Sequence, residues 1–86
     1  MPLRRKHLNT LEAIFSYPIQ ANIHWIDIEA LLIALGAECS EGRCSRLRVV
    51  LNDVRAVFHQ PHPRKEASKS TVRSVRRFLD EAGVSV

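Results

Sequence analysis

Apolar residues recur every three or four positions in three stretches of this 86-residue chain, the spacing of helices that bury one face. The first stretch predicts a helix within residues 7–18 that is capped by Asn9 or Thr10 and stopped by Pro18. The basic segment at residues 1–6 precedes it and is expected to form a frayed tail. The pattern therefore predicts one short helix ahead of the main part of the chain.

The other two helical stretches lie on either side of a region with a different pattern. One covers residues 25–35 and ends at Gly36, a residue that favours helix C-termini. The other begins near Ser68 or Ser70, which are both good N-cap residues, and ends at Gly83. Their apolar stripes consist of Trp25, Ile28, Leu31, Leu32 and Leu35, and of Val72, Val75, Phe78, Leu79 and Ala82.

Between these helices apolar and polar residues alternate, which is the pattern of strands with one buried face. Residues 37–40 form one predicted strand, and residues 45–51 and 54–59 form two more around an Asn52-Asp53 hairpin turn. The paired positions on one face are all apolar: Leu47, Val49, Leu51, Val54, Ala56 and Phe58. The other face pairs Arg46 with His59, Arg48 with Val57, and Val50 with Arg55.

These elements predict a single domain over residues 1–86 with an α+β fold. After the extra helix the order is α-β-β-β-α, and three antiparallel strands have one face covered by helices. A chain of this length supports one small core of two layers. No apolar run approaches the roughly 20 residues of a membrane span, and no signal peptide is recognised, so we expect a cytoplasmic protein without membrane contact.

Basic residues are concentrated in the second half of the chain. Residues 43–77 hold ten Lys or Arg and two acidic residues, a net charge of +8 within a chain whose total is +4. Such a concentration is typical of a protein that binds a polyanion, although an arginine-rich solvated face has the same composition. Cys39 and Cys44 are expected to be reduced thiols, because a lone Cys-x4-Cys pair is a weak metal motif. We therefore expect no metal and no cofactor.

The junction between the last strand and the last helix holds groups that suit phosphate chemistry. Its cations and its helix start form a predicted phosphate site: Arg64, Lys65, Lys69, Ser70 and Arg73. Metal-free RNA cleavage needs a base, an acid and cations for the developing charge, and histidine is the usual acid or base near neutral pH. His59 and His62 are therefore candidate catalytic residues, with Arg46 and Arg48 as further phosphate ligands. For either histidine the alternative is a surface residue without a chemical role.

The same junction carries a family resemblance. The run His62-Pro63-Arg64-Lys65-Glu66, followed by Thr71-Val72-Arg73-Ser74-Val75 and Ala82-Gly83-Val84, resembles the C-terminal signature of the HicA family of bacterial toxins. Residues 28–37 resemble that family's first helix and first strand, so the resemblance covers about residues 25–84. It implies a double-stranded-RNA-binding-like fold, an mRNA-cleaving endoribonuclease of a type II toxin–antitoxin system, and a HicB-like antitoxin as partner. Such folds read backbone shape and phosphates more than sequence.

The chain departs from the family pattern at one position. The family's usual catalytic histidine follows a Gly-Ser pair at the start of the second strand, where this chain reads Cys44-Ser45-Arg46. The hairpin register places His59 opposite Arg46, so we hypothesise that the histidine has moved to the partner strand and that Arg46 binds phosphate. Two other interpretations stay open: a non-catalytic RNA-binding module, and a module whose basic face docks an acidic antitoxin-like partner.

Overall fold

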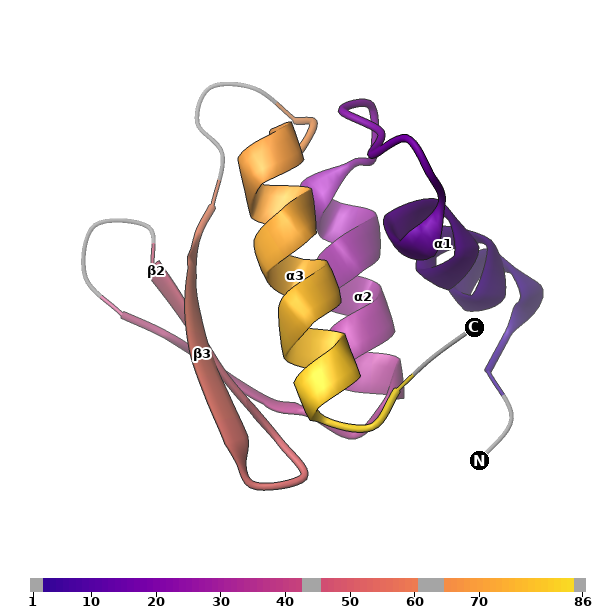
Figure 1. Ribbon diagram of the computed structural model, residues 1–86. Helices are drawn as coiled ribbons and strands as arrows, with labels where there is room; N and C mark the ends of the chain where they lie inside the picture. Colours follow the sequence, from indigo (N-terminus) through magenta and orange to yellow (C-terminus); the bar gives the residue numbers. More distant parts are fainter. Residues whose placement is uncertain (1–2, 43–45, 61–64, 85–86) are drawn as a thin grey trace.

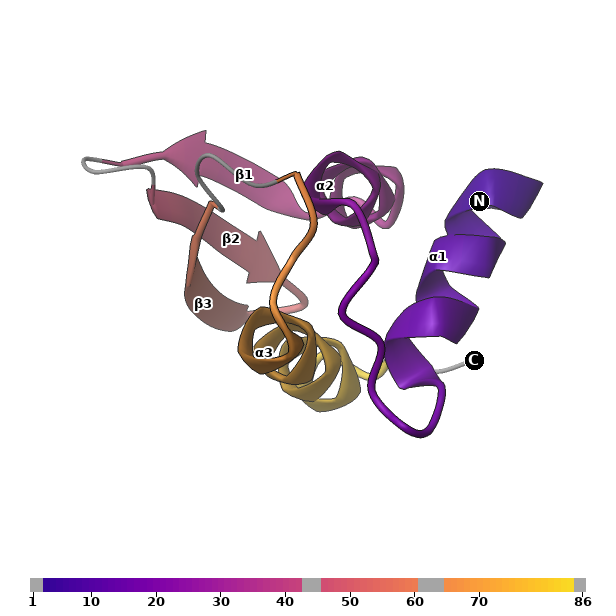
Figure 2. The same ribbon diagram turned by 90° about the horizontal axis from the view of Figure 1, so that it is seen from above.

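The computed structural model describes residues 3–42, 46–60 and 65–84 (Figure 1). Its elements are α1 (Arg5–Phe15), α2 (Trp25–Ala34), β1 (Glu38–Glu41), β2 (Arg46–Leu51), β3 (Val54–His59) and α3 (Lys69–Glu81). The order after α1 is α-β-β-β-α, which confirms the predicted α+β fold with an extra N-terminal helix. Figure 2 shows three layers: the sheet, then α2 and α3, then α1 on the far side of these two helices. Within the described residues, no helix has the length and apolar character needed to cross a membrane.

The three strands pair antiparallel in the order β1-β2-β3. The β2–β3 register is the predicted one throughout, from the turn to the Arg46–His59 pair at the open end of the hairpin. Asn52 and Asp53 in the turn have φ angles of 50° and 67°. Two positive φ angles give the tight turn whose twist matches that of the flanking strands. The inner face of the hairpin is buried at Leu47, Val49, Leu51 and Phe58.

An aromatic cluster joins the sheet to both of the helices that cover it. The Phe58 ring lies edge-on to the Trp25 ring of α2, with 6.2 Å between the ring centroids. It also lies edge-on to the Phe78 ring of α3 at 5.7 Å. Such edge-to-face pairs add about 0.5–1.5 kcal/mol to what burial alone contributes. Trp25 is only 7% exposed, so it is a core residue, as its place in the apolar stripe predicts.

The boundaries of α1 differ from the sequence prediction. The helix begins at Arg5, inside the predicted tail, and ends at Phe15 rather than close to Pro18. Asn9 and Thr10 therefore lie within the helix and do not cap it; the Thr10 hydroxyl instead donates to the carbonyl of Lys6 at 3.0 Å. The start carries no side-chain cap, so the free N–H groups of this exposed helix end are left to solvent. A cap-based prediction consequently placed the start too late.

Arg76 holds α1 against α3. Its Nε donates to the carbonyl of Ile14 at 2.9 Å, and its terminal nitrogen donates to the carbonyl of Ser16 at 2.5 Å. These carbonyls belong to the C-terminal end of α1, where backbone oxygens lack partners within the helix and the helix dipole is negative. Leu11 and Ile14 of α1 are buried beside this contact. Arg76 is therefore a structural cation and is not part of a free basic surface.

Candidate nucleic-acid interface

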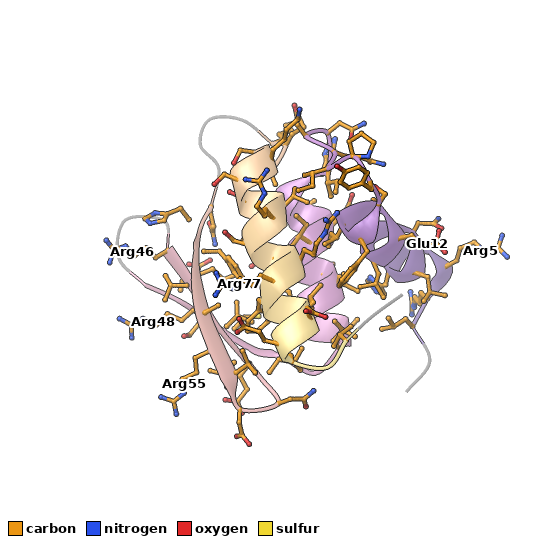
Figure 3. All side chains as sticks on the ribbon, in the orientation of Figure 1. Arg5, Glu12, Arg46, Arg48, Arg55 and Arg77 are labelled. Carbon is orange, nitrogen blue, oxygen red and sulfur yellow. The ribbon has the colours of Figure 1, made fainter. Side chains whose placement is uncertain are left out.

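The face of the sheet turned away from α2 and α3 carries a row of arginines. Strand alternation and the register place Arg46 and Arg48 of β2 on this face together with Arg55, Val57 and His59 of β3. We call these five residues the outer face. All five side chains are exposed. Figure 3 shows the three arginines of the outer face projecting in a row away from the helices. Among the described residues, no helix covers this side of the sheet (Figure 2).

Arg46 and His59 lie directly opposite each other at the open end of the hairpin. Pairs in an antiparallel hairpin alternate between hydrogen-bonded and non-hydrogen-bonded kinds, and the pair that closes a tight turn is hydrogen-bonded. Counting from the Leu51–Val54 pair at the turn, the Arg46–His59 pair is of the non-hydrogen-bonded kind. Its Cα atoms are then about 4.5 Å apart, the closer of the two spacings. A guanidinium and an imidazole on this pair can therefore contact the same small group.

An open hollow of about 610 Å³ lies beside this pair. It is lined by Ser40, Glu41, Gly42, Arg46, Arg48 and Val57. The amide of Gly42 donates to the carbonyl of Arg46 at 2.7 Å, which extends the pairing of β1 and β2 beyond the strands. A β-carbon at Gly42 would lie 3.7 Å from Nε of Arg48, so the guanidinium of Arg48 lies over the end of β1. Two cations and one carboxylate, that of Glu41, therefore surround the hollow.

We call the segment between the end of β3 and the first turn of α3 the basic junction, and the structure describes only part of it. Ser68 is the N-cap of α3, and its hydroxyl accepts a hydrogen bond from the amide of Thr71 at 3.2 Å, which confirms the first of the two predicted caps. The predicted site residues in this segment that the structure describes are all exposed: Lys65, Lys69, Ser70 and Arg73. His62 and Arg64, which were also predicted, lie outside the described residues. Lys65 is anchored through its backbone, because its carbonyl accepts from the amide of Trp25 at 2.9 Å.

The predicted site residues fall into two groups. The outer face lies on one side of the sheet, whereas Lys69, Ser70 and Arg73 belong to α3, which packs against the other side (Figure 2). Figure 1 shows the end of β3 and the start of α3 at the same end of the molecule. Arg55 is not among the predicted phosphate ligands, although the predicted register already places it on the outer face.

The other potentially reactive groups of the described residues are the metal-ligand side chains and the thiol of Cys39. The described residues contain no group of three His, Cys, Asp or Glu side chains that could hold a metal ion. Cys39 is half-buried on β1, and burial, followed by the negative charge of Glu29, raises the pKa of its thiol. A raised pKa leaves less reactive thiolate at neutral pH. Cys44 lies outside the described residues.

Fold and site together define a small α+β protein with an α-β-β-β-α core and an exposed basic sheet face. The family described as the HicA toxin of bacterial toxin–antitoxin systems matches residues 25–84. The chain therefore belongs to the HicA toxin family, as the resemblance in its sequence indicated, and toxins of such systems are paired with an antitoxin. The match begins at the first residue of α2 and so leaves α1 outside it. Searches among curated proteins and among solved structures found no match to the chain.

Proposed function

We propose that this chain is a cytoplasmic toxin that binds mRNA on its outer face, cleaves it without a metal, and is neutralised by a HicB-like antitoxin. The observation that carries the proposal is the facing pair of Arg46 and His59, with Arg48 two positions further along the same strand. These three residues supply two phosphate ligands and one proton-transfer group on an exposed surface. Family membership adds the toxin–antitoxin context.

The chemistry assigned to the pair is transesterification at one phosphodiester. The ribose 2′-oxygen attacks phosphorus and loses its proton to a base, while the bond to the 5′-oxygen breaks and that oxygen receives a proton from an acid. His59 serves in one of these two steps. Arg46 and Arg48 bind the non-bridging oxygens, on which negative charge develops. His62, which lies outside the described residues, is the candidate for the second proton transfer.

The test is RNA cleavage by the purified protein in the presence of a chelator. His59→Ala is expected to lower the cleavage rate by about 10²–10⁴-fold, the usual contribution of a general acid or base. Arg48→Ala should weaken RNA binding and reduce the salt dependence of binding by about one phosphate contact. Arg5→Ala removes the same charge from α1, far from the outer face, and should change neither property (Figure 3). Cleavage at the wild-type rate by folded His59→Ala protein would refute the assigned role.

An exchange of the two residues offers a sharper test of the pair. In the double variant Arg46→His, His59→Arg, both functional groups stay on the same face and the histidine takes the family position. Cleavage should be retained in the double variant and lost in Arg46→Ala, His59→Ala. An exchange variant that folds, binds RNA and does not cleave it would show that the pair is not the reacting centre.

Arg46 in the place of the family's histidine favours one alternative function: a module that binds RNA without cutting it. Such a protein would bind RNA with steep salt dependence and leave it intact in the cleavage assay. The other alternative is a module whose basic face only docks an antitoxin. If the affinity for RNA does not change between low and moderate salt, antitoxin docking is favoured over both RNA cleavage and RNA binding without cleavage.

A further inference from the structure

A second hollow, of about 340 Å³, lies between α1 and α2. We call it the α1–α2 cleft. Its polar lining includes Lys6, His7, Asn9, Asn22, His24 and Asp27. Its volume is at the lower end of the range for pockets that hold small molecules. Because α1 lies outside the family match, this cleft exists only through the additional helix.

The wall of the cleft is joined by hydrogen bonds to the basic junction. The amide of Trp25 donates to the carbonyl of Lys65 at 2.9 Å, and the amide of Ala67 donates to the carbonyl of Ile23 at 2.8 Å. His24 pairs with Glu66 in the short antiparallel bridge between these bonds. The segment that carries His24 therefore has the junction on one side and the cleft on the other. Figure 1 shows the starts of α2 and α3 at the same end of the molecule.

The lining groups suit a nucleobase better than a bare anion. Amide side chains such as that of Asn22 present a donor and an acceptor together, and a carboxylate such as that of Asp27 accepts from an exocyclic amine. Imidazole rings stack on bases. The side chains of His7, Asn22 and His24 make no hydrogen bond to another described residue, so their polar atoms are available to a ligand.

The charges of the lining residues also favour a nucleotide over a bare anion. Lys6 contributes one positive charge and Asp27 contributes one negative charge, so the fixed charges in the cleft cancel apart from the histidines. Asp27 would repel a free phosphate or sulfate and so oppose the attraction of Lys6. A nucleotide can place its base beside Asp27 and its phosphate toward Lys6 or the junction.

We propose that the α1–α2 cleft binds one nucleotide of a bound RNA, next to the part of the strand that the junction and the outer face hold. This inference rests on the proposed function and assigns the additional helix a role in it. The bridge between His24 and Glu66 places the wall of the cleft beside Lys65, so RNA held at the junction would lie next to the cleft. The additional helix thereby lengthens the RNA-binding surface of the family core.

RNA binding by cleft variants tests the proposal. Asn22→Ala and Lys6→Ala are expected to weaken affinity for an oligoribonucleotide about tenfold, the loss expected for one base that no longer binds. Arg5→Ala is the matched control for Lys6→Ala, because it removes the same charge from the same turn of α1. Figure 3 shows Arg5 pointing away from α2, and it does not line the cleft. Equal effects of Lys6→Ala and Arg5→Ala, with no effect of Asn22→Ala, would overturn the proposal.

Binding of single nucleotides provides an independent measurement. In the amide NMR spectrum of the wild-type protein, AMP and CMP should shift resonances of residues 22–24 and of the first turn of α1, and inorganic phosphate should not. Equal shifts with phosphate, or none with either nucleotide, would overturn the base-binding assignment. If the cleft variants bind like wild type while Arg48→Ala loses RNA, the proposed function stands and this inference fails. If wild type binds no RNA at all, the proposed function fails and the nucleotide spectra decide the cleft by themselves.

Discussion

Removing the guanidinium of Arg76 tests how the additional helix is held. In Arg76→Ala, the carbonyls of Ile14 and Ser16 lose the donors that now bind them at 2.9 and 2.5 Å. Hydrogen bonds to a charged group contribute about 1.5–3 kcal/mol each, and a cation at a helix C-terminus adds up to about 2 kcal/mol when partly buried. Both bonds are only part-buried and water replaces them in the variant, so we expect a total loss of about 2–3 kcal/mol.

The assay is urea and thermal unfolding, with hydrogen exchange as a local readout. For a domain of this size, a loss of 2–3 kcal/mol corresponds to a fall in Tm of roughly 10–20 °C. Amides of α1 should exchange faster in Arg76→Ala than in wild type, while those of β2 change less, because the affected contact is local. Arg76→Lys should be intermediate, since an ammonium group lacks the planar fork that reaches two carbonyls together.

Arg77→Ala is the matched control on the same helix. Arg77 makes an ion pair with Glu81 at 3.1 Å, with side chains that are 83% and 53% exposed. Pairs of this kind contribute about 0.3–0.5 kcal/mol, so the control should fall in Tm by no more than a few degrees. If Arg76→Ala and Arg77→Ala unfold alike, Arg76 does not hold α1 and the interpretation of its two hydrogen bonds is wrong.

Three further predictions concern the N-cap of α3, the hairpin turn and the thiol of Cys39. Ser68→Ala removes the N-cap bond of α3 and should cost about 1 kcal/mol in urea unfolding; no change would mean that solvent caps the helix equally well. Asn52→Ala should cost about 1–2 kcal/mol, because it loses both a side chain suited to φ 50° and a 2.8 Å hydrogen bond to the C-cap carbonyl of α3, whereas Asn52→Gly should cost less. In a Cys44→Ser chain, Cys39 is the remaining thiol. Because its pKa is raised, its alkylation rate should increase at a higher pH in the folded chain than in the unfolded chain. Glu29→Gln removes one cause of the raised pKa and should shift this pH part of the way back. Because the unfolded thiol deprotonates first, folding stability should fall as pH rises above the ordinary thiol pKa; rapid alkylation of the folded chain at neutral pH would contradict this reasoning.

The hairpin was predictable from sequence because its constraints are local. A two-residue turn fixes which residues face each other, and a one-residue slip would have buried Arg48 or exposed Val49. One register therefore agrees with both the two-residue turn and the burial of the apolar face, and the structure has this register. The caps and stripes of α2 and α3 were equally local, which is why their predicted ends lie within one or two residues of the observed ones.

What could not be predicted depends on contacts between distant parts of the chain. In the sequence, Arg76 resembles the other cations of an arginine-rich helix, and its partners lie about 60 positions away, at the C-terminal end of α1. The α1–α2 cleft could not be predicted from the sequence for the same reason, since its walls come from two helices and their connection. The start of α1 was misplaced because the helix has no side-chain cap for a sequence pattern to reveal.

The register is compatible with the hypothesis that the catalytic histidine of this chain stands on β3 instead of β2. Moving a side chain by one position along β2 would turn it from the outer face into the core, and moving it by two would shift it by about 7 Å. Moving it to the facing position on β3 keeps it on the same face and within side-chain reach of its former place. The cross-strand pair is therefore a short route by which the proposed catalytic group could change strand without a new site being built. Arg46 opposite His59 is the arrangement that such a change would leave.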